Sequence, residues 1–269
     1  MNQPLNLYDK LNLPQQPWKR DKAIQAEHKN EKVLWSADLM KSIPTYLDTT
    51  IIIYDANNKP LKFKQYIKAV FNDEALIYLD RGKWKLQRLT KTGLDSFYKD
   101  DLSAGKSERW NAIRNPDTSK SVEIKFKKIA NTLSMADYIL VSKSNRKMYV
   151  KRKGVKMLEF NINLGGKPIG AKEYEGDRKT PEGVYHIDMK FDRADKFYKS
   201  FWISYPDSAD KARALKKGLK PGGSVLIHGT SPERMNSKDW TNGCIALKND
   251  EMDSLFNHVI SGATIEIRK

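Results

Sequence analysis

Short runs in which apolar and polar residues alternate dominate the second half of the chain, and this pattern is typical of half-buried β-strands. Three extended stretches occupy residues 137–166, separated by a Ser-Asn turn and a Lys-Gly turn, and the runs GVYHIDMKF, FWISYP, GSVLIHG and ATIEIRK follow. Helical patterns are limited to residues 208–217 and 250–259, and Asn249 or Asp250 is the expected N-cap of the second helix. The second half therefore predicts a mainly antiparallel sheet or barrel with short helices.

The first half is less regular. Residues 18–42 are a candidate helix that ends before Pro44. Residues 45–95 are β-rich: TTIIIYDANNKPLKF predicts one hairpin, and ALIYLDRGKWKLQRL predicts another, with its turn at Asp80-Arg81-Gly82. Residues 96–133 are assigned to a linker. We expect an α+β chain, mainly β with short helices, in which a smaller mixed α/β or β-rich accessory region, 1–133, precedes a larger domain, 134–269.

The chain is strongly basic, and this narrows the choice of partner. Its net charge of +16 is shared equally by residues 1–133 and 134–269, so the charge is not gathered in a basic tail. Such a surface suits nucleic acid, anionic lipid or an acidic polymer such as cell wall. The sequence has no zinc-finger spacing, RNA-recognition aromatic motif or basic heptad region, so we expect no nucleic-acid partner.

Two further classes of protein are disfavoured. No window approaches the 18–20 apolar residues that a membrane-spanning helix needs, so we expect no integral membrane segment. Residues 1–20 also lack the basic start, apolar core and cleavage site of a signal peptide. The single cysteine excludes an internal disulfide and any metal site built on several thiolates.

The single cysteine is either a packing residue or a catalytic nucleophile. In IHGTSPERMNSKDWTNGCIALKND, residues 227–250, His228 ends an apolar run and Cys244 follows sixteen positions later. A free cysteine commonly packs as a small apolar residue. Alternatively, His228 takes the thiol proton, the thiolate attacks a carbonyl carbon, and backbone N–H groups at the Gly243 turn stabilise the oxyanion. The spacing alone leaves both interpretations open.

The same stretch resembles the catalytic motif of the L,D-transpeptidases with a YkuD-type domain, which has a histidine, a loop of a dozen or more residues and then Ser/Thr-His-Gly-Cys. The resemblance extends upstream to the signature GD-x-x-TPEG-x-Y, which occupies residues 176–185, and to ISYP, GLKPGGSVLIHG and DWTNGCIAL. It covers about Met135 to Lys269 and is most specific for the murein-processing branch. It implies that residues 134–269 form a YkuD-type β-sandwich or barrel catalytic domain.

The resemblance also implies roles for individual residues. Cys244 would be the nucleophile that forms a thioester, and His228 would be its base, oriented by the backbone carbonyl of Gly229. Gly243 and Cys244 would offer the N–H groups of the oxyanion site. The residues implied at the substrate pocket are Thr241, Asn242 and Trp240, of which Trp240 either contacts substrate or packs beneath the loop.

This sequence departs from the family pattern at two positions near the cysteine. Asn242 replaces the second histidine, and because an amide cannot take a proton at neutral pH, His228 must be the base. Ala246 replaces a residue that is often Arg or Asn. Of the other histidines, we expect a structural role for His186 and surface positions for His28 and His258.

The activity implied is attack on the bond between the diamino acid and D-alanine of a peptidoglycan stem tetrapeptide. Transfer of the thioester to an amine would give 3-3 crosslinks, D-amino acid exchange or protein attachment. Transfer to water would make the protein an L,D-carboxypeptidase or endopeptidase, which could also act as a secreted antibacterial effector. A protein-cleaving cysteine peptidase and a wall-binding module with an inactive site remain as alternatives.

The expected partners are peptidoglycan stem peptides, and no metal or other cofactor is implied. The activity places the protein in the periplasm or cell envelope; a secreted effector or a cytoplasmic location are the alternatives. The acceptor and the oligomeric state are left open by the sequence.

Overall fold

The computed structural model describes residues 33–90, 121–192 and 197–269. The chain divides after Ser134 into two compact units, and residues 79–83 group with the second unit. Among the described residues, no helix combines the length and apolar character that a membrane crossing requires.

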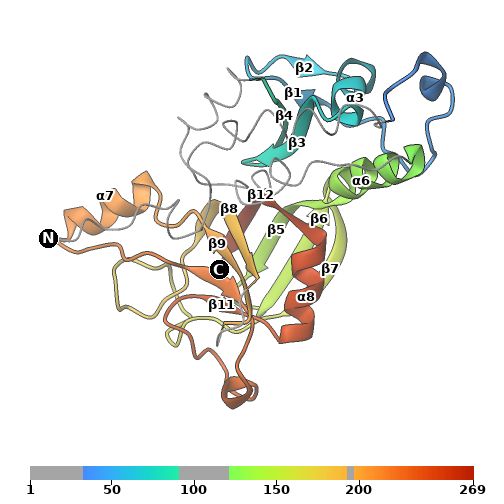
Figure 1. The fold of residues 1–269 in the computed structure, drawn as a ribbon. Coiled ribbons are helices and arrows are strands. Elements are labelled where there is room, and N and C mark those ends of the chain that lie inside the picture. The colour runs from blue at the N-terminus through green and yellow to red at the C-terminus, as the bar shows by residue number, and fades with distance from the viewer. Residues whose placement is uncertain (1–32, 91–120, 193–196) are drawn as a thin grey trace, which may run out of the picture. The chain divides into compact units, whose positions relative to one another are not determined.

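The first unit contains a four-stranded sheet in the order β2-β1-β4-β3 (Figure 1). Strands β1 (Ile53–Tyr54) and β2 (Pro60–Leu61) pair antiparallel around the Asn-Asn turn, which confirms the first predicted hairpin. Strands β3 (Ala75–Asp80) and β4 (Lys83–Arg88) are neighbours in the same sheet and flank the predicted turn.

The helices of this unit differ from the sequence predictions. Helix α3 (Phe63–Phe71) follows β2, and helix α6 (Val122–Ser134) lies in residues that were assigned to the linker. Only the end of the candidate helix at 18–42 falls within the described residues, and there the chain forms a short 3₁₀ helix, η2 (Ala37–Met40).

The sequence did not predict helix α6, because a lysine among its buried positions interrupts the helical spacing of apolar residues. Phe126, Ile129 and Leu133 are buried at helical spacing, but Lys125 is buried beside them. Its ammonium donates to the carbonyl oxygen of Phe71 at 2.8 Å and lies 2.9 Å from a carboxylate oxygen of Asp73. A lysine that finds such partners can occupy the inner face of a helix.

The second unit is built on one eight-stranded sheet in the order β11-β10-β9-β8-β12-β5-β6-β7 (Figure 1). Neighbouring strands pair antiparallel except for β12 with β5 and β10 with β11. The strands are β5 (Ala136–Ser142), β6 (Lys147–Arg152), β7 (Val155–Asn161), β8 (Gly183–Asp192), β9 (Lys199–Ile203), β10 (Leu226–His228), β11 (Ile245–Ala246) and β12 (Val259–Arg268). This mainly β architecture with short helices confirms the predicted fold class.

Two helices accompany this sheet, as predicted: α7 (Ser208–Lys216) and α8 (Asn249–His258), together with a 3₁₀ turn, η3 (Pro232–Arg234). Helix α8 packs against β9 and β12. The ammonium of Lys190 caps its C-terminal end by donating to the carbonyl oxygens of Phe256, at 2.6 Å, and Val259, at 2.8 Å.

The predicted N-cap of α8 is wrong. The helix begins at Asn249 with Lys248 as its N-cap. The side-chain oxygen of Asn249 accepts instead from the N–H of Thr230, at 2.9 Å, and so ties the loop after β10 to the helix. The side-chain amide of Asn249 thus makes a tertiary hydrogen bond instead of capping the helix.

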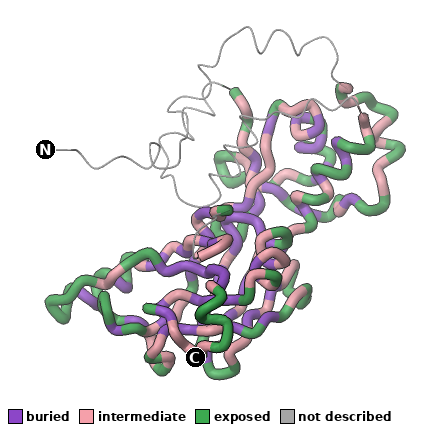
Figure 2. The backbone as a smooth tube through the Cα atoms, turned by 60° about the horizontal axis from the view of Figure 1, so that its bottom comes forward, coloured by how far each residue is buried: buried purple, intermediate pink, exposed green. Residues whose placement is uncertain are grey.

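The core of the second unit lies on the sheet: burial alternates along β8, whereas β10 and β11 are buried at every residue. Ile139 on β5 and Met148 on β6 are fully buried, whereas Val155 on β7 is 69% exposed. Figure 2 shows buried segments through the interior and exposed segments at the turns.

We expect Ile139→Ala to lower the free energy of unfolding by about 2–5 kcal/mol, because it leaves a cavity in a fully packed strand. Val155→Ala is the matched control and should change it by less than about 0.5 kcal/mol. Urea unfolding of the full chain, followed by tryptophan fluorescence, measures both. Equal effects of the two substitutions would contradict this placement of the core.

Candidate active site

His228 is the last residue of β10, where the strand lies between β9 and β11. Its register partners are Ser200 on β9 and Ala246 on β11. Its side chain is only 1% exposed. The histidine is therefore held within the sheet rather than on the mobile part of a loop.

One hydrogen bond sets the tautomer of this histidine. Nδ1 of His228 lies 2.6 Å from the carbonyl oxygen of Gly229. Since a carbonyl oxygen only accepts, Nδ1 carries the proton and the lone pair of the neutral ring is at Nε2. The Gly229 carbonyl thereby orients the imidazole ring.

Glycine is required at position 229 by its surroundings. A Cβ built there would lie 2.4 Å from Oδ1 of Asn249 and 2.8 Å from Cβ of Tyr198. The Gly229 N–H also donates to the carbonyl oxygen of Phe197, at 3.0 Å. The backbone that orients His228 is therefore clamped between the start of α8 and the segment before β9.

Two aromatic rings pack edge-on against the imidazole. The ring of Phe197 lies 5.0 Å from that of His228, centroid to centroid, and the ring of Trp240 lies 5.7 Å away. The guanidinium of Arg234 lies over Trp240 at 5.9 Å. Trp240 thus packs against the predicted base, and these aromatic contacts restrict the rotation of its ring.

The thiol of Cys244 lies against the strand that carries His228. Its Sγ accepts from the N–H of Leu226 at 3.4 Å, and the thiol donates to the carbonyl oxygen of Ser224 at 3.8 Å. The residue is partly exposed. Burial of the sulfur raises the pKa of Cys244, while the Leu226 N–H and the ammonium of Lys172 act in the opposite direction.

Strand pairing places the segment at Cys244 beside the strand that ends at His228. Ile227 pairs with Ile245, and His228 pairs with Ala246. Cys244 immediately precedes β11, and its Sγ contacts the backbone of Leu226, two residues before His228 on β10. Two segments sixteen residues apart in sequence are therefore neighbours in the sheet.

The turn before the cysteine is held by the hydroxyl of Thr241. This hydroxyl donates to the carbonyl oxygen of Cys244 at 2.7 Å and accepts from the N–H of Gly243 at 3.1 Å. The Gly243 N–H, one of the two expected oxyanion donors, is therefore engaged within the turn. The N–H of Cys244 makes no hydrogen bond to the part of the chain that the structure describes, and Asn242 is exposed.

The segment after β7 forms one side of this turn. Asn163 and Ala246 exchange both backbone hydrogen bonds at 2.8 Å. The Thr241 N–H donates to the carbonyl oxygen of Leu164 at 3.1 Å, and the Gly166 N–H donates to that of Thr241 at 3.0 Å. Sequence reasoning did not identify this segment, because its contribution is backbone pairing, which any side chain permits.

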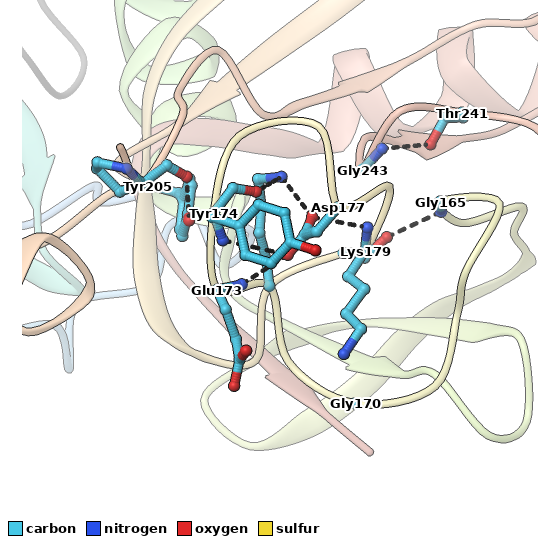
Figure 3. Close-up of polar contacts among 12 residues, drawn as sticks. Gly165, Gly170, Glu173, Tyr174, Asp177, Lys179, Tyr205, Thr241 and Gly243 are labelled. Carbon is cyan, nitrogen blue, oxygen red and sulfur yellow. Dashed lines mark hydrogen bonds and ion pairs between the residues drawn. The ribbon is translucent and has the colours of Figure 1, made fainter. Parts of the chain in front are cut away.

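The TPEG segment, residues 180–183, packs next to the segment that pairs with the Gly243 turn. Oγ1 of Thr180 accepts from the N–H of Gly165 at 3.0 Å (Figure 3). The buried ammonium of Lys143 donates to the carbonyl oxygen of Thr180 at 3.0 Å and to Oε1 of Glu182 at 2.8 Å. These contacts give the TPEG segment a scaffolding role next to the turn.

The preceding Gly-Asp of the signature organises a second cluster, in which the carboxylate of Asp177 is the centre (Figure 3). It accepts from the N–H groups of Glu173 at 2.7 Å, Tyr174 at 3.2 Å and Lys179 at 3.0 Å, and pairs with the ammonium of Lys172 at 2.8 Å. Burial opposes ionisation, but these donors outweigh it and hold the pKa of Asp177 below its usual value.

The loop between His228 and Cys244 is anchored by an ion pair that sequence reasoning missed. Arg146 makes a bidentate pair with Asp239, with nitrogen-to-oxygen distances of 2.7 to 3.0 Å. Asp239 also accepts from the N–H of Leu164 at 3.1 Å. The pair joins residues 93 positions apart, so no local pattern could have revealed it.

The other described histidines, His186 and His258, lie on elements that carry neither His228 nor Cys244. His186, on β8, lies 2.9 Å from a carboxylate oxygen of Asp188. His258, at the end of α8, is exposed and contacts the carbonyl oxygen of Ser254 at 2.7 Å through Nδ1. His28 falls outside the described residues. Within residues 33–90, 121–192 and 197–269, no group of three or more His, Cys, Asp or Glu side chains could hold a metal ion.

A stretch of this chain is similar in sequence to a curated protein. “Putative L,D-transpeptidase YafK” of Escherichia coli (strain K12) is 30% identical over 98 residues, which are 36% of this chain and 34% of that protein. This chain thus spans about a third of the curated relative's length.

Among solved structures, the helical cell shape determining protein Pgp2 from Campylobacter jejuni is 26% identical, with a TM-score of 0.42, over 51% of each chain. Bd1075 from Bdellovibrio bacteriovorus is also 26% identical, with a TM-score of 0.39, over 50% of this chain and 48% of that one.

The model of the YkuD family, the L,D-transpeptidase catalytic domain, matches residues 136–267. The matched range contains β5 to β12, both members of the Cys244–His228 pair and the Gly-Asp/TPEG signature. Residues 136–267 belong to the YkuD family of L,D-transpeptidase catalytic domains.

Proposed function

We propose that the protein is a cysteine acyltransferase that acts on peptidoglycan stem peptides. The observation that supports this most directly is the hydrogen bond from Nδ1 of His228 to the Gly229 carbonyl. It leaves Nε2 as the basic nitrogen of a histidine that closely follows residues 224–226, whose backbone contacts the thiol of Cys244.

The reaction would proceed in two halves. In the first, Nε2 of His228 accepts the proton of Cys244, and Sγ attacks the carbonyl carbon of the diamino acid in a stem tetrapeptide. A carbon–sulfur bond forms, the amide carbon–nitrogen bond breaks, and the imidazolium returns its proton to the amine of D-alanine. In the second half, His228 deprotonates an incoming acceptor that attacks the thioester and releases Cys244.

The oxyanion of each tetrahedral intermediate needs donors that are free when it forms. We assign this role to the N–H of Cys244. Gly243 contributes instead through its conformation: its φ is +128°, and its N–H is engaged by Thr241. Thr241 is thereby a residue that shapes the turn rather than one that lines the pocket.

The choice of substrate class rests on the family and on charge. A net charge of +16 favours a substrate that carries carboxylates, and stem peptides carry several. The amine acceptors would be a second stem peptide, giving a 3-3 crosslink, a free D-amino acid or a protein. With water as acceptor, the same thioester gives carboxypeptidase or endopeptidase products. An envelope location, the periplasm in particular, follows from this substrate.

We expect Cys244→Ala to abolish release of D-alanine from defined tetrapeptide muropeptides, because no thioester can form. His228→Ala should reduce the rate about 10²–10⁴-fold through loss of the general base. Mass spectrometry of the products measures both effects, and with the unsubstituted protein it separates crosslinking, exchange and hydrolysis.

Circular dichroism serves as the control in this experiment, since both variants should retain the unsubstituted fold. Release of D-alanine by folded Cys244→Ala would overturn the assignment. Cleavage of casein with no action on muropeptides would point instead to a peptidase that acts on proteins.

We expect Gly243→Ala to lower the free energy of unfolding by about 1–3 kcal/mol and to suppress turnover. A Cβ there would lie 2.7 Å from the carbonyl oxygen of Lys179, and the φ of +128° is unfavourable for alanine. Gly223→Ala is the matched control, because a Cβ at that position has no neighbour within 4 Å. Urea unfolding and the muropeptide assay measure both variants; wild-type behaviour of Gly243→Ala would refute the role of this turn.

A further inference from the structure

A buried lysine that the reaction scheme does not use lies beside the cysteine turn. Lys172 is 5% exposed, and its ammonium donates to Oδ1 of Asp177 at 2.8 Å and to the carbonyl oxygen of Tyr174 at 3.0 Å. These two oxygens use two of the three N–H donors of the ammonium. Its position is therefore determined by the Gly-Asp part of the signature.

The side chain of Lys172 lies close to both Gly243, which precedes the cysteine, and Gly222, which precedes the segment that contacts the thiol. A Cβ built on Gly243 would lie 3.8 Å from Nζ, so the ammonium faces the residue that precedes the nucleophile. A Cβ built on Gly222 would lie 3.5 Å from Cε of the lysine. The chain from Gly222 leads directly to Ser224 and Leu226, whose backbone atoms contact Sγ.

The acid partner does not depend on this lysine alone. Asp177 already accepts three backbone N–H groups, so its carboxylate keeps strong donors when the ammonium is removed. Burial of an ion pair gives little net stability compared with apolar packing. Holding the loop at residues 172–177 therefore does not by itself explain why a charged residue is buried at position 172.

Few charged or titratable groups surround the thiol. Strand β10 contributes His228, and the loop at 172–177 contributes Lys172 and Asp177. Lys179 contacts Gly243 through its backbone, but its ammonium points away from the turn in Figure 3. Strand β11 and residues 222–226 contribute no titratable side chain. Lys172 is the cation that opposes the effect of burial on the pKa of Cys244.

We propose that Lys172 is a positioning residue whose ammonium, held by Asp177 beside the Gly243 turn, stabilises the negative charge on Sγ of Cys244 after His228 has taken its proton. The ammonium keeps all its protons throughout and forms no bond to the substrate. The inference builds on the proposed role of Cys244 as nucleophile. It adds that the loop bearing the Gly-Asp signature acts on the sulfur electrostatically as well as supporting the turn.

Alkylation of the thiol tests this inference independently of turnover. Cys244 is the only cysteine in the chain, so the rate at which iodoacetamide adds mass to the intact protein reports on its thiolate alone. We expect Lys172→Met to raise the midpoint of the alkylation–pH profile by about one pH unit and to slow alkylation at neutral pH about tenfold. Lys172→Arg, which retains the charge, should restore most of the rate.

Lys217→Met is the matched control. It removes a lysine that pairs with Glu173 of the same loop, at 2.8 Å, but on the exposed side of that loop. Its alkylation profile should match that of the unsubstituted protein. If Lys217→Met shifts the midpoint as much as Lys172→Met does, loosening of the loop explains the effect and the proposal fails.

A double variant decides the matter if Lys172→Met does not fold. Lys172→Met/Asp177→Asn removes both charges together and leaves no buried ion without a partner. The proposal requires an upward shift in this variant, smaller than that of Lys172→Met because the loss of the Asp177 charge acts in the opposite direction, once circular dichroism shows it to be folded. A profile that overlays the unsubstituted one would overturn the proposal.

Turnover of muropeptides, measured alongside, separates this inference from the proposed function. A shifted alkylation profile in a protein that releases no D-alanine at all would retain the role of Lys172 and refute the activity. Loss of turnover in Lys172→Met with an unchanged alkylation profile would make the lysine merely structural and refute the inference.

Discussion

In strand β10 the Nδ1–H of His228 donates to the carbonyl oxygen of the next residue, and the basic nitrogen of the ring is thereby Nε2. This bond depends on tight packing around Gly229, where Asn249 and Tyr198 occupy the space of any side chain. Asn249 has exchanged a helix-capping role for a hydrogen bond to Thr230. The helix that follows the cysteine therefore helps to fix the backbone that selects the tautomer of His228.

Backbone groups, more than side chains, hold Cys244 in place. The backbone of segments 163–166 and 178–180 packs closely against the Gly243 turn. The thiol itself hydrogen-bonds to backbone atoms of Ser224 and Leu226. Thr241 closes the turn internally. Such a site depends little on the identity of its side chains, because most partners of the turn and the thiol are backbone carbonyls and N–H groups.

The electrostatics of the site follow from partial burial. Burial raises the pKa of the Cys244 thiol, and the ammonium of Lys172 acts in the opposite direction. Both buried lysines of this region are paired: Lys172 with Asp177, and Lys143 with Glu182. Neither lysine is therefore an isolated ion in a region of low dielectric constant.

Strand periods and the order of motifs were sufficient to predict the sheet of the second unit and its two helices, because alternation of side chains across a sheet is a local property. The same reasoning missed α6, whose inner face includes Lys125, since the carboxylate that makes this burial possible is on Asp73. The sequence by itself determined that His228 and Cys244 occur in a YkuD signature. The tertiary structure alone decided that the Gly243 N–H is already engaged, that Asn249 caps no helix and that Lys172 faces the cysteine turn. These outcomes depend on hydrogen bonds and close contacts between segments distant in the chain, which no local pattern encodes.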